Sequence, residues 1–254
     1  MWIFPARRVH FCGFGGGQLA SKPRVNSTIS QRRIVSDSTR TPILELHYQR
    51  YLIDQDSASF IKQLTRKYSI GTLERLAMSA CRRESRRAAV LALGYIANYQ
   101  SNHVLGMAMN DEDRGVRLAA ENGIRSVWTR DGNDSQRQLL GIVMRLIAAK
   151  QFAEAIDRAT ELVEAAPWFA EAWNQRAIAH YSLGEYGDSI TDCHETLEYN
   201  PYHFAAASGM GQCYLQLDDR TRALECFRRA LKLNPNMEGI RANIVHLERA
   251  QESE

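Results

Sequence analysis

The sequence predicts an all-α protein, an α-solenoid in which helix pairs stack on one another. Two internal repeats support this prediction. Pro167, Pro201 and Pro235 follow one another at intervals of 34 residues, and an upstream region aligns with itself after a shift of 31 residues. A unit of this length holds two helices and cannot bury an apolar face alone, so neighbouring units must stack. We therefore expect one continuous helical solenoid.

The composition sets limits on the class of protein. The 254 residues carry 32 basic and 29 acidic side chains, a net charge of +3, which is too balanced for a chain that coats nucleic acid or anionic lipid along its whole length. With 44% hydrophobic residues the chain can bury a core. Charged residues interrupt every apolar run, so no membrane span is predicted. The five cysteines show no C-x-x-C spacing, so neither a disulfide framework nor a zinc knuckle is expected.

Charge divides the chain into three regions. Residues 1–40 hold seven basic groups and one acid together with prolines and glycines, which predicts a basic and disordered leader. Its Arg- and Ser-rich composition leaves an organelle-targeting segment as the alternative to a cytoplasmic protein with a disordered tail. Residues 41–135 are nearly neutral, and residues 136–254 carry a net charge of −5. We predict helical repeats in both of these regions.

The 31-residue period lies in the first helical region. It aligns residues 86–89 with 117–120, and it also aligns the preceding helices. The pattern resembles short HEAT-type repeats over about 58–131. That resemblance implies that an acid in a turn pairs with an arginine at the start of a helix, so Asp113 with Arg117 and Glu84 with Arg87 are the expected pairs.

The 34-residue period lies in the second helical region. Small residues stand twelve positions before each proline, which lets two helices approach closely: Ala155, Ser189 and Ala223. The pattern resembles three tetratricopeptide repeats (TPRs) over 136–235. The third unit matches the family pattern best, at Gly211, Tyr214, Ala223, Phe227, Ala230 and Pro235. Asp134 and Ser135 are expected to cap the first helix. An amphipathic helix over 238–250, with Ile240, Ile244, Val245 and Leu247 on its apolar face, is expected to cover the open end.

No catalytic or metal-binding constellation is evident in the sequence. G-x-S-x-G, H-E-x-x-H and phosphate-loop motifs are absent, and the seven histidines lack metal-ligand spacing. We therefore expect no enzymatic activity, no cofactor and no metal. The densest local charge is an arginine cluster, which is either an anion-binding strip or a turn of solvated and ion-paired arginines: Arg82, Arg83, Arg86 and Arg87.

The TPR resemblance implies a ligand surface on the first helix of each unit, where such arrays hold an extended peptide or a partner helix. Spacing selects these candidate contacts: Leu140, Met144, Ile147, Asn174, Ile178, Tyr181, Ser208, Gln212, Leu215 and Asn243. A family subgroup grips C-terminal carboxylates with basic residues and asparagines. Only Asn174 agrees with that pattern here, so a carboxylate clamp is not expected. Ordinary solvated helix residues are the alternative reading of this surface.

The sequence thus favours a non-catalytic module that binds a protein or peptide partner. The runner-up is an accessory protein of nucleic acid that uses the leader and the arginine cluster. A lyase of the short HEAT-repeat kind is a weaker third reading, kept by fold analogy alone. The oligomeric state is not predicted.

Overall fold

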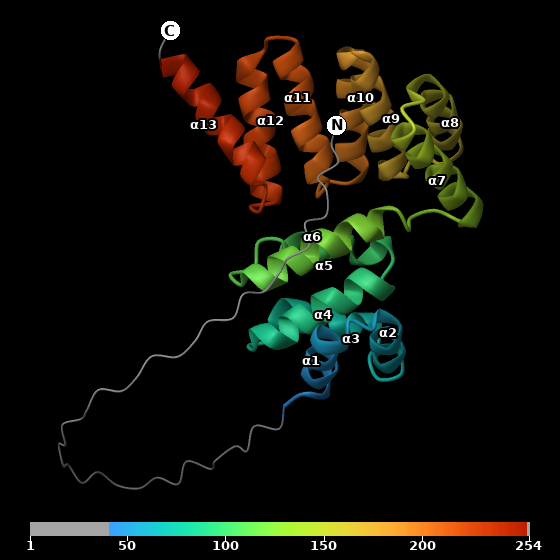
Figure 1. Cartoon of the computed structure of the whole chain (residues 1–254), viewed down its shortest axis with the longest axis vertical. Coiled ribbons are helices and arrows are strands. Elements are labelled where there is room, and N and C mark those ends of the chain that lie inside the picture. The colour runs from blue at the N-terminus through green and yellow to red at the C-terminus, as the bar shows by residue number, and fades with distance from the viewer. Residues whose placement is uncertain (1–40, 253–254) are drawn as a thin grey trace, which may run out of the picture. The chain divides into compact units, whose positions relative to one another are not determined.

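The computed structural model describes residues 41–252, which form thirteen α-helices, one short 3-10 helix and no strand (Figure 1). The all-α prediction is confirmed for this range. None of the helices within it is both long and apolar enough to cross a membrane. The predicted leader, residues 1–40, lies outside the described residues.

The first helical region contains six α-helices and the 3-10 helix η1. Its core is a cluster of buried apolar side chains that includes Leu93, Leu105 and Ile124. Helix α4 packs against α3 and α6, and α5 packs against α6. The elements are α1 (Ile43–Asp54), α2 (Ser57–Thr65), α3 (Ile70–Ser79), α4 (Arg83–Ile96), η1 (Tyr99–Ser101), α5 (Asn102–Ala108) and α6 (Arg114–Trp128).

Two local features shape this region. Asp56, Ser69 and Asp113 each accept a hydrogen bond from a backbone N–H in the first turn of the helix that follows, which satisfies one donor that the helix itself cannot. Helices α4 and α6 cross at Gly94 and Gly123. A Cβ added to Gly94 would lie 2.8 Å from the Cα of Gly123, so neither position has room for a side chain.

The second helical region contains seven helices. Consecutive helices pack against each other from α7 to α13, as three hairpins and a closing helix. The helices are α7 (Asp134–Ala148), α8 (Phe152–Ala165), α9 (Ala170–Leu183), α10 (Tyr186–Tyr199), α11 (Phe204–Gln216), α12 (Arg220–Leu233) and α13 (Glu238–Glu252). The small residues of the period are buried as expected, since Ala155, Ser189 and Ala223 are each fully inaccessible.

Two details of this region differ from expectation. Helix α7 is capped by Asn133 rather than by Asp134 or Ser135: Asn133 accepts from the N–H of Gln136, whose side chain accepts from the N–H of Asn133. In α13, Ile240, Ile244 and Leu247 are buried against α12, but Val245 is 41% exposed. The closing helix therefore uses a narrower apolar face than the sequence suggests.

The stack is interrupted between α6 and α7, which sequence analysis does not anticipate. Helix α7 packs against α8 and α9, whereas α6 packs against α4 and α5. The end of the first region lies instead against the connections that follow α10 and α12. Asn102 donates to the Oδ1 of Asn200 at 2.9 Å, and the Tyr99 hydroxyl donates to the carbonyl of Tyr199 at 3.0 Å. Polar contacts thus join segments about a hundred residues apart.

Candidate functional site

Three rows of side chains run across the first helices of the hairpins. Within each row the residues are 34 positions apart, so each row holds one equivalent residue from α7, α9 and α11. The first row is Leu140, Asn174 and Ser208; the second is Met144, Ile178 and Gln212; the third is Ile147, Tyr181 and Leu215.

The first row is buried. Leu140 is 1% exposed, Asn174 6% and Ser208 3%. Asn174 donates its amide to the carboxylate of Glu171, and the Ser208 hydroxyl donates to the carbonyl of Ala205. Asn174 and Ser208, which are predicted ligand contacts, are therefore buried, and their side chains are hydrogen-bonded within the protein.

The second and third rows are largely accessible. Met144 is 40% exposed, and Ile178, Gln212, Tyr181 and Leu215 are half-buried. Ile147 is the exception at 9% exposed. Asn243 on α13, the last of the predicted contacts, is also half-buried. We call the accessible set the first-helix surface: Met144, Ile178, Tyr181, Gln212, Leu215 and Asn243.

Tyr181 is held in place within this surface. Its ring lies 5.5 Å from that of Tyr186, centroid to centroid, at an interplanar angle of 60°. Burial is the main reason that the pKa of Tyr181 is raised above its ordinary value, and the phenol therefore stays protonated at neutral pH. A protonated phenol is a hydrogen-bond donor and acceptor.

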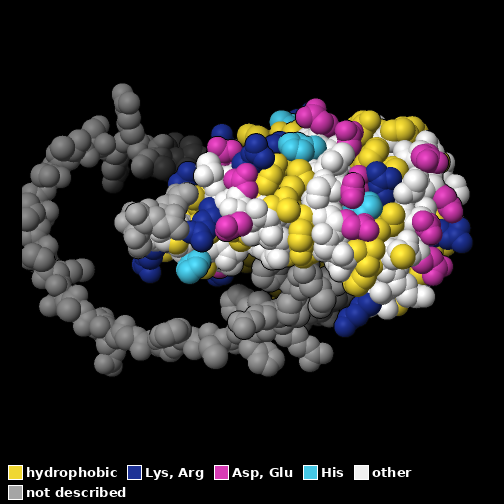
Figure 2. Space-filling view, turned by 90° about the horizontal axis from the view of Figure 1, so that it is seen from above, with side chains coloured by type: hydrophobic (Ala, Val, Ile, Leu, Met, Phe, Trp, Pro, Cys, Tyr) yellow, Lys and Arg dark blue, Asp and Glu magenta, His cyan; other side chains and the backbone are white. Residues whose placement is uncertain are grey.

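Exposed charge lies mainly on the second helices of the hairpins. Helix α8 exposes Glu154, Asp157, Arg158, Glu161 and Glu164, and α12 exposes Arg222, Glu225, Arg228, Arg229 and Lys232. The members of the first-helix surface are all uncharged. Figure 2, which views the molecule from above Figure 1, shows acidic, basic and apolar side chains interspersed on that face. The face drawn in Figure 2 therefore carries no continuous stripe of like charges.

A buried polar network lies beneath the first row. The carboxylate of Glu171 accepts from His203 Nε2 at 3.0 Å and from Gln175 Nε2 at 2.5 Å, in addition to Asn174. Burial alone would raise the pKa of Glu171, but these hydrogen bonds outweigh it, and the pKa lies below its ordinary value. His203 Nδ1 accepts from the N–H of Ala206, so the ring proton is on Nε2. The network fixes the start of α11.

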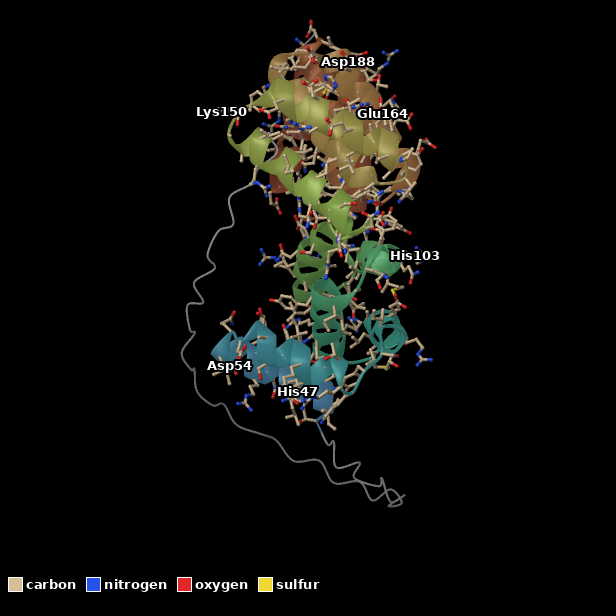
Figure 3. The ribbon with its side chains drawn as sticks, turned by 90° about the vertical axis from the view of Figure 1, so that its right-hand side faces the viewer. His47, Asp54, His103, Lys150, Glu164 and Asp188 are labelled. Carbon is tan, nitrogen blue, oxygen red and sulfur yellow. The ribbon has the colours of Figure 1, made fainter. Side chains whose placement is uncertain are left out.

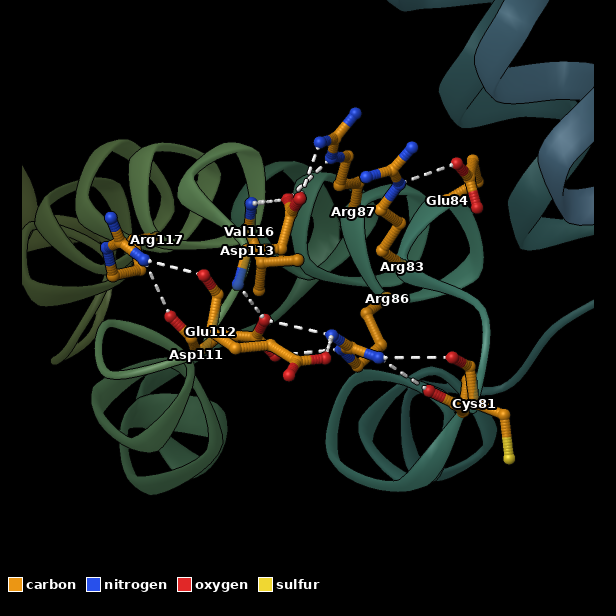
Figure 4. A network of polar contacts seen from close by, with 11 residues as sticks. Cys81, Arg83, Glu84, Arg86, Arg87, Asp111, Glu112, Asp113, Val116 and Arg117 are labelled. Atoms are coloured by element: carbon orange, nitrogen blue, oxygen red, sulfur yellow. Dashed lines mark hydrogen bonds and ion pairs between the residues drawn. The ribbon is translucent and has the colours of Figure 1, made fainter.

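The four clustered arginines are all engaged with carboxylates. Figure 4 shows the contacts of Arg83, Arg86 and Arg87. Arg82 pairs with Glu45, and Arg83 with Glu84. Arg86 is only 8% exposed; its guanidinium donates to Asp111 at 2.8 and 3.1 Å and to Glu112 at 2.9 Å. Each positive charge has a nearby negative one. The side chains of Arg82 and Arg83 are nevertheless 48% and 64% exposed, so the anion-binding strip stays a prediction.

The arginine partners also differ from the expected pairs. Arg87 donates to both carboxylate oxygens of Asp113 at 2.6 Å, while Arg117 donates to the carbonyls of Asp111 and Glu112. Chiefly through the hydrogen bond from Arg87, the pKa of Asp113 falls to about 2. Arg87, near the start of α4, thus pairs with an acid in the turn that precedes α6.

A recess of about 210 Å³ lies on the first helical region, and sequence reasoning missed it. It is bounded by Tyr51 of α1, by Leu91 and Tyr95 of α4, and by Asn122 and Ser126 of α6. The hydroxyls of Tyr51 and Tyr95 are hydrogen-bonded at 2.8 Å. The close contact of Gly94 and Gly123 forms its floor. In the sequence, the signal for this recess is the pair Gly94 and Gly123, which lie inside predicted helices.

Comparison with protein families places repeats in the second helical region. Residues 140–195 and 205–237 each match a family model described as tetratricopeptide repeat. These matches include all nine residues in the three rows, and they confirm the TPR resemblance over most of the predicted range.

Several curated proteins are similar to parts of the chain. A TPR repeat-containing protein of Rhizobium etli is 30% identical over 125 residues, which are 49% of this chain and 60% of the relative. The Hsp70-Hsp90 organizing protein of Triticum aestivum is 27% identical over 41% of this chain and 18% of its own length. Superkiller complex protein 3 of Mus musculus is 24% identical over 90% of this chain but 13% of its own length. The chain thus spans less than two thirds of each of these relatives.

Solved structures show weaker similarity. The first TPR domain of Spaghetti (RPAP3), bound to an HSP90 peptide, is 22% identical with a TM-score of 0.45, over 46% of this chain and 93% of that one. YrrB, a TPR protein with a peptide-binding site described as unusual, is 17% identical with a TM-score of 0.41, over 81% and 99%.

Proposed function

We propose that this chain, whose residues 140–195 and 205–237 match tetratricopeptide-repeat models, is a non-catalytic interaction module that binds an extended peptide or a partner helix on its first-helix surface. The observation that carries the proposal is the accessible second row, in which Met144, Ile178 and Gln212 occupy equivalent positions on three successive hairpins. A ligand lying across α7, α9 and α11 meets a side chain of this row at each repeat.

The chemistry of the surface indicates how a ligand is held. Met144, Ile178 and Leu215 offer apolar area, and burying such area supplies most of the affinity of small interfaces. Gln212, Asn243 and the Tyr181 hydroxyl can hydrogen-bond a peptide backbone and set its register. None of the six members is charged. Binding should therefore depend weakly on salt, unlike the binding of a polyanion.

A nucleic-acid role is less well supported by the contacts. Arg82, Arg83, Arg86 and Arg87 are each engaged with at least one carboxylate. Binding to phosphate would have to replace these ion pairs rather than fill empty positions.

We further propose that helices α3 to α6 are two short HEAT-like units. Support comes from the contacts of Arg86 and Arg87 at the start of α4, which reach Asp111 and Asp113 in the turn before α6. These pairs link one helix hairpin to the next, as expected for stacked units.

A random-peptide display selection with the full-length protein tests the main proposal. Selected peptides are then titrated by fluorescence anisotropy against the wild type, Tyr181→Ala, Gln212→Ala and the control His194→Ala, which removes an exposed side chain of α10. We expect each first-helix variant to weaken binding by about tenfold, which corresponds to about 1.4 kcal/mol, and the control to leave it unchanged. The proposal would be contradicted if the selected peptides bound Tyr181→Ala and Gln212→Ala as tightly as the wild type.

A further inference from the structure

The turn between α9 and α10 brings together three side chains with metal-ligand atoms. His180 comes from the last turn of α9, and Glu185 and Asp188 come from the start of α10. Their ligand atoms all lie within 4.8 Å of one another. Gly184 makes the turn possible, because it adopts φ 82°, a left-handed conformation that favours glycine. No sequence motif announces the cluster, since the three residues come together only when the helices form a hairpin.

We propose that His180, Glu185 and Asp188 bind a divalent transition-metal ion of the Zn²⁺ class. One imidazole nitrogen and two carboxylate oxygens form a donor set suited to such an ion, whereas Ca²⁺ and Mg²⁺ prefer oxygen ligands alone. The inference is independent of peptide binding, because it rests on the hairpin turn and on none of the first-helix surface.

A second observation concerns the other nitrogen of the imidazole ring. His180 Nδ1 faces Glu185, with its Oε2 at 2.6 Å, while Nε2 faces the carboxylate of Asp192, with its Oδ2 at 3.8 Å. Asp192 is 2% exposed and is fixed by two hydrogen bonds from Arg176 at 2.8 and 2.7 Å. A histidine that ligates a metal through one nitrogen usually donates the other to a carboxylate or carbonyl, which fixes the ring orientation. Here the Asp192 carboxylate lies beyond hydrogen-bond distance of Nε2, but it places a negative charge beside the ring.

Access and charge also suit a cation. The side chain of Glu185 is 46% exposed and Asp188 is exposed, so the open positions of a bound ion would face solvent. His180 lies at the carboxyl end of α9, whose dipole favours positive charge, whereas Glu185 and Asp188 lie at the amino end of α10, whose dipole opposes it. The attraction for a cation therefore comes from the two carboxylates. Figure 3 shows Asp188 at the end of the second helical region that is far from His103, a residue of α5 in the first region. The site is therefore remote from the contacts that join the two regions.

Binding changes one interaction that the turn already makes. The His180–Glu185 contact at 2.6 Å is a hydrogen bond without metal, and an ion would replace its proton and be ligated by both groups. Together with the backbone bond from the N–H of Glu185 to the carbonyl of His180, this bond joins α9 to α10 without any metal. The experiment must therefore distinguish metal binding from a purely structural role of the His180–Glu185 hydrogen bond.

Titration of the full-length protein with Zn²⁺ by calorimetry, and with Co²⁺ by visible absorption, tests the site. The variants are His180→Ala, Asp188→Asn and Asp192→Asn, with His194→Ala as the matched control on α10. Cys81→Ser is a second control, because Cys81 is an exposed thiol that could bind these ions itself. Circular dichroism without metal establishes that each variant is folded.

We expect the wild type to bind one Zn²⁺ per protein molecule at this site. Relative to the wild type, the affinity should fall more than about tenfold in His180→Ala and Asp188→Asn and about tenfold in Asp192→Asn. The two controls should leave this binding unchanged, and the Co²⁺ spectrum should lack thiolate charge transfer. Zn²⁺ should also raise the Tm of the wild type but not of His180→Ala. The proposal is overturned if His180→Ala and Asp188→Asn bind as the wild type does, if Cys81→Ser alone abolishes binding, or if no Zn²⁺ binds.

Discussion

Trp128 and His203 stack face to face, with ring centroids 4.0 Å apart and planes inclined by 20°. Trp128 ends α6, and His203 immediately precedes α11, so this pair joins the two helical regions. The indole N–H of Trp128 also donates to the Oδ1 of Asn102 at 2.8 Å, and Asn102 in turn donates to Asn200. Trp128 is only 3% exposed. An aromatic stack and a short polar chain thus hold the first region against the second.

Trp128→Ala should be strongly destabilising, because it removes a large buried ring and leaves the Oδ1 of Asn102 without its hydrogen-bond donor. We expect the free energy of unfolding to fall by about 3–5 kcal/mol, measured by urea denaturation. Trp168→Ala is the matched control, since Trp168 is 53% exposed and its loss should cost about 0.5 kcal/mol or less. Equal costs for the two substitutions would contradict the packing described here.

Asp113→Asn tests the ion pair with Arg87. Asparagine also caps helices well, so the substitution keeps the cap of α6 but removes the charge and one of the two oxygens that accept from Arg87. The pKa of Asp113 is lowered to about 2, so its ionised form stabilises the folded state above about pH 4, and this contribution is lost as the pH falls through about 2. We expect Asp113→Asn to cost about 1–2 kcal/mol at pH 7.

The pH dependence supplies the control for that prediction. The difference in unfolding free energy between wild type and Asp113→Asn should shrink as the pH is lowered from about 4 towards about 2, as measured by denaturant titrations at several pH values. Asp134→Asn, whose side chain is 90% exposed, should show almost no difference at any pH. A difference that stays constant through the acid range would rule out the ion pair as its cause.

Gly94→Ala tests the close crossing of α4 and α6. The added Cβ would lie 2.8 Å from the Cα of Gly123, and backbone cannot move aside without separating the helices. We expect a loss of about 1–3 kcal/mol in thermal or chemical unfolding. Gly71→Ala is the control: no atom lies within 4 Å of its added Cβ, and alanine favours helix, so it should stabilise by up to about 1 kcal/mol. A neutral Gly94→Ala would mean that the helices are farther apart.

The second helical region could be predicted from sequence because its signals are local. Pro201 and Pro235 end hairpins at a fixed period, and small residues such as Ala155 and Ala223 lie where two helices must approach. The closing helix follows from the same pattern. The two accessible rows were also predictable, since residues 34 positions apart on stacked hairpins share one surface.

The remaining features depend on contacts between distant segments. The burial of Asn174 follows from its hydrogen bond to Glu171, a buried acid that His203 also contacts. The helix stack is interrupted after α6, where the ring of Trp128 packs on that of His203. Neither pairing has a periodic signal. The arginine partners were missed for a related reason: Arg87 of α4 reaches an acid in the turn before α6, and one sequence does not determine which of several nearby acids it meets.

Hydrogen–deuterium exchange with and without a saturating selected peptide tests whether the peptide binds the first-helix surface. We expect the peptide to slow exchange in the carboxyl-terminal halves of α9 and α11, over residues 176–183 and 210–216, where Ile178, Tyr181 and Gln212 lie. Exchange in α4 and α12 should not change. Protection confined to α4 and α6, or to the second helices of the hairpins, would show that the ligand binds elsewhere and would contradict the account.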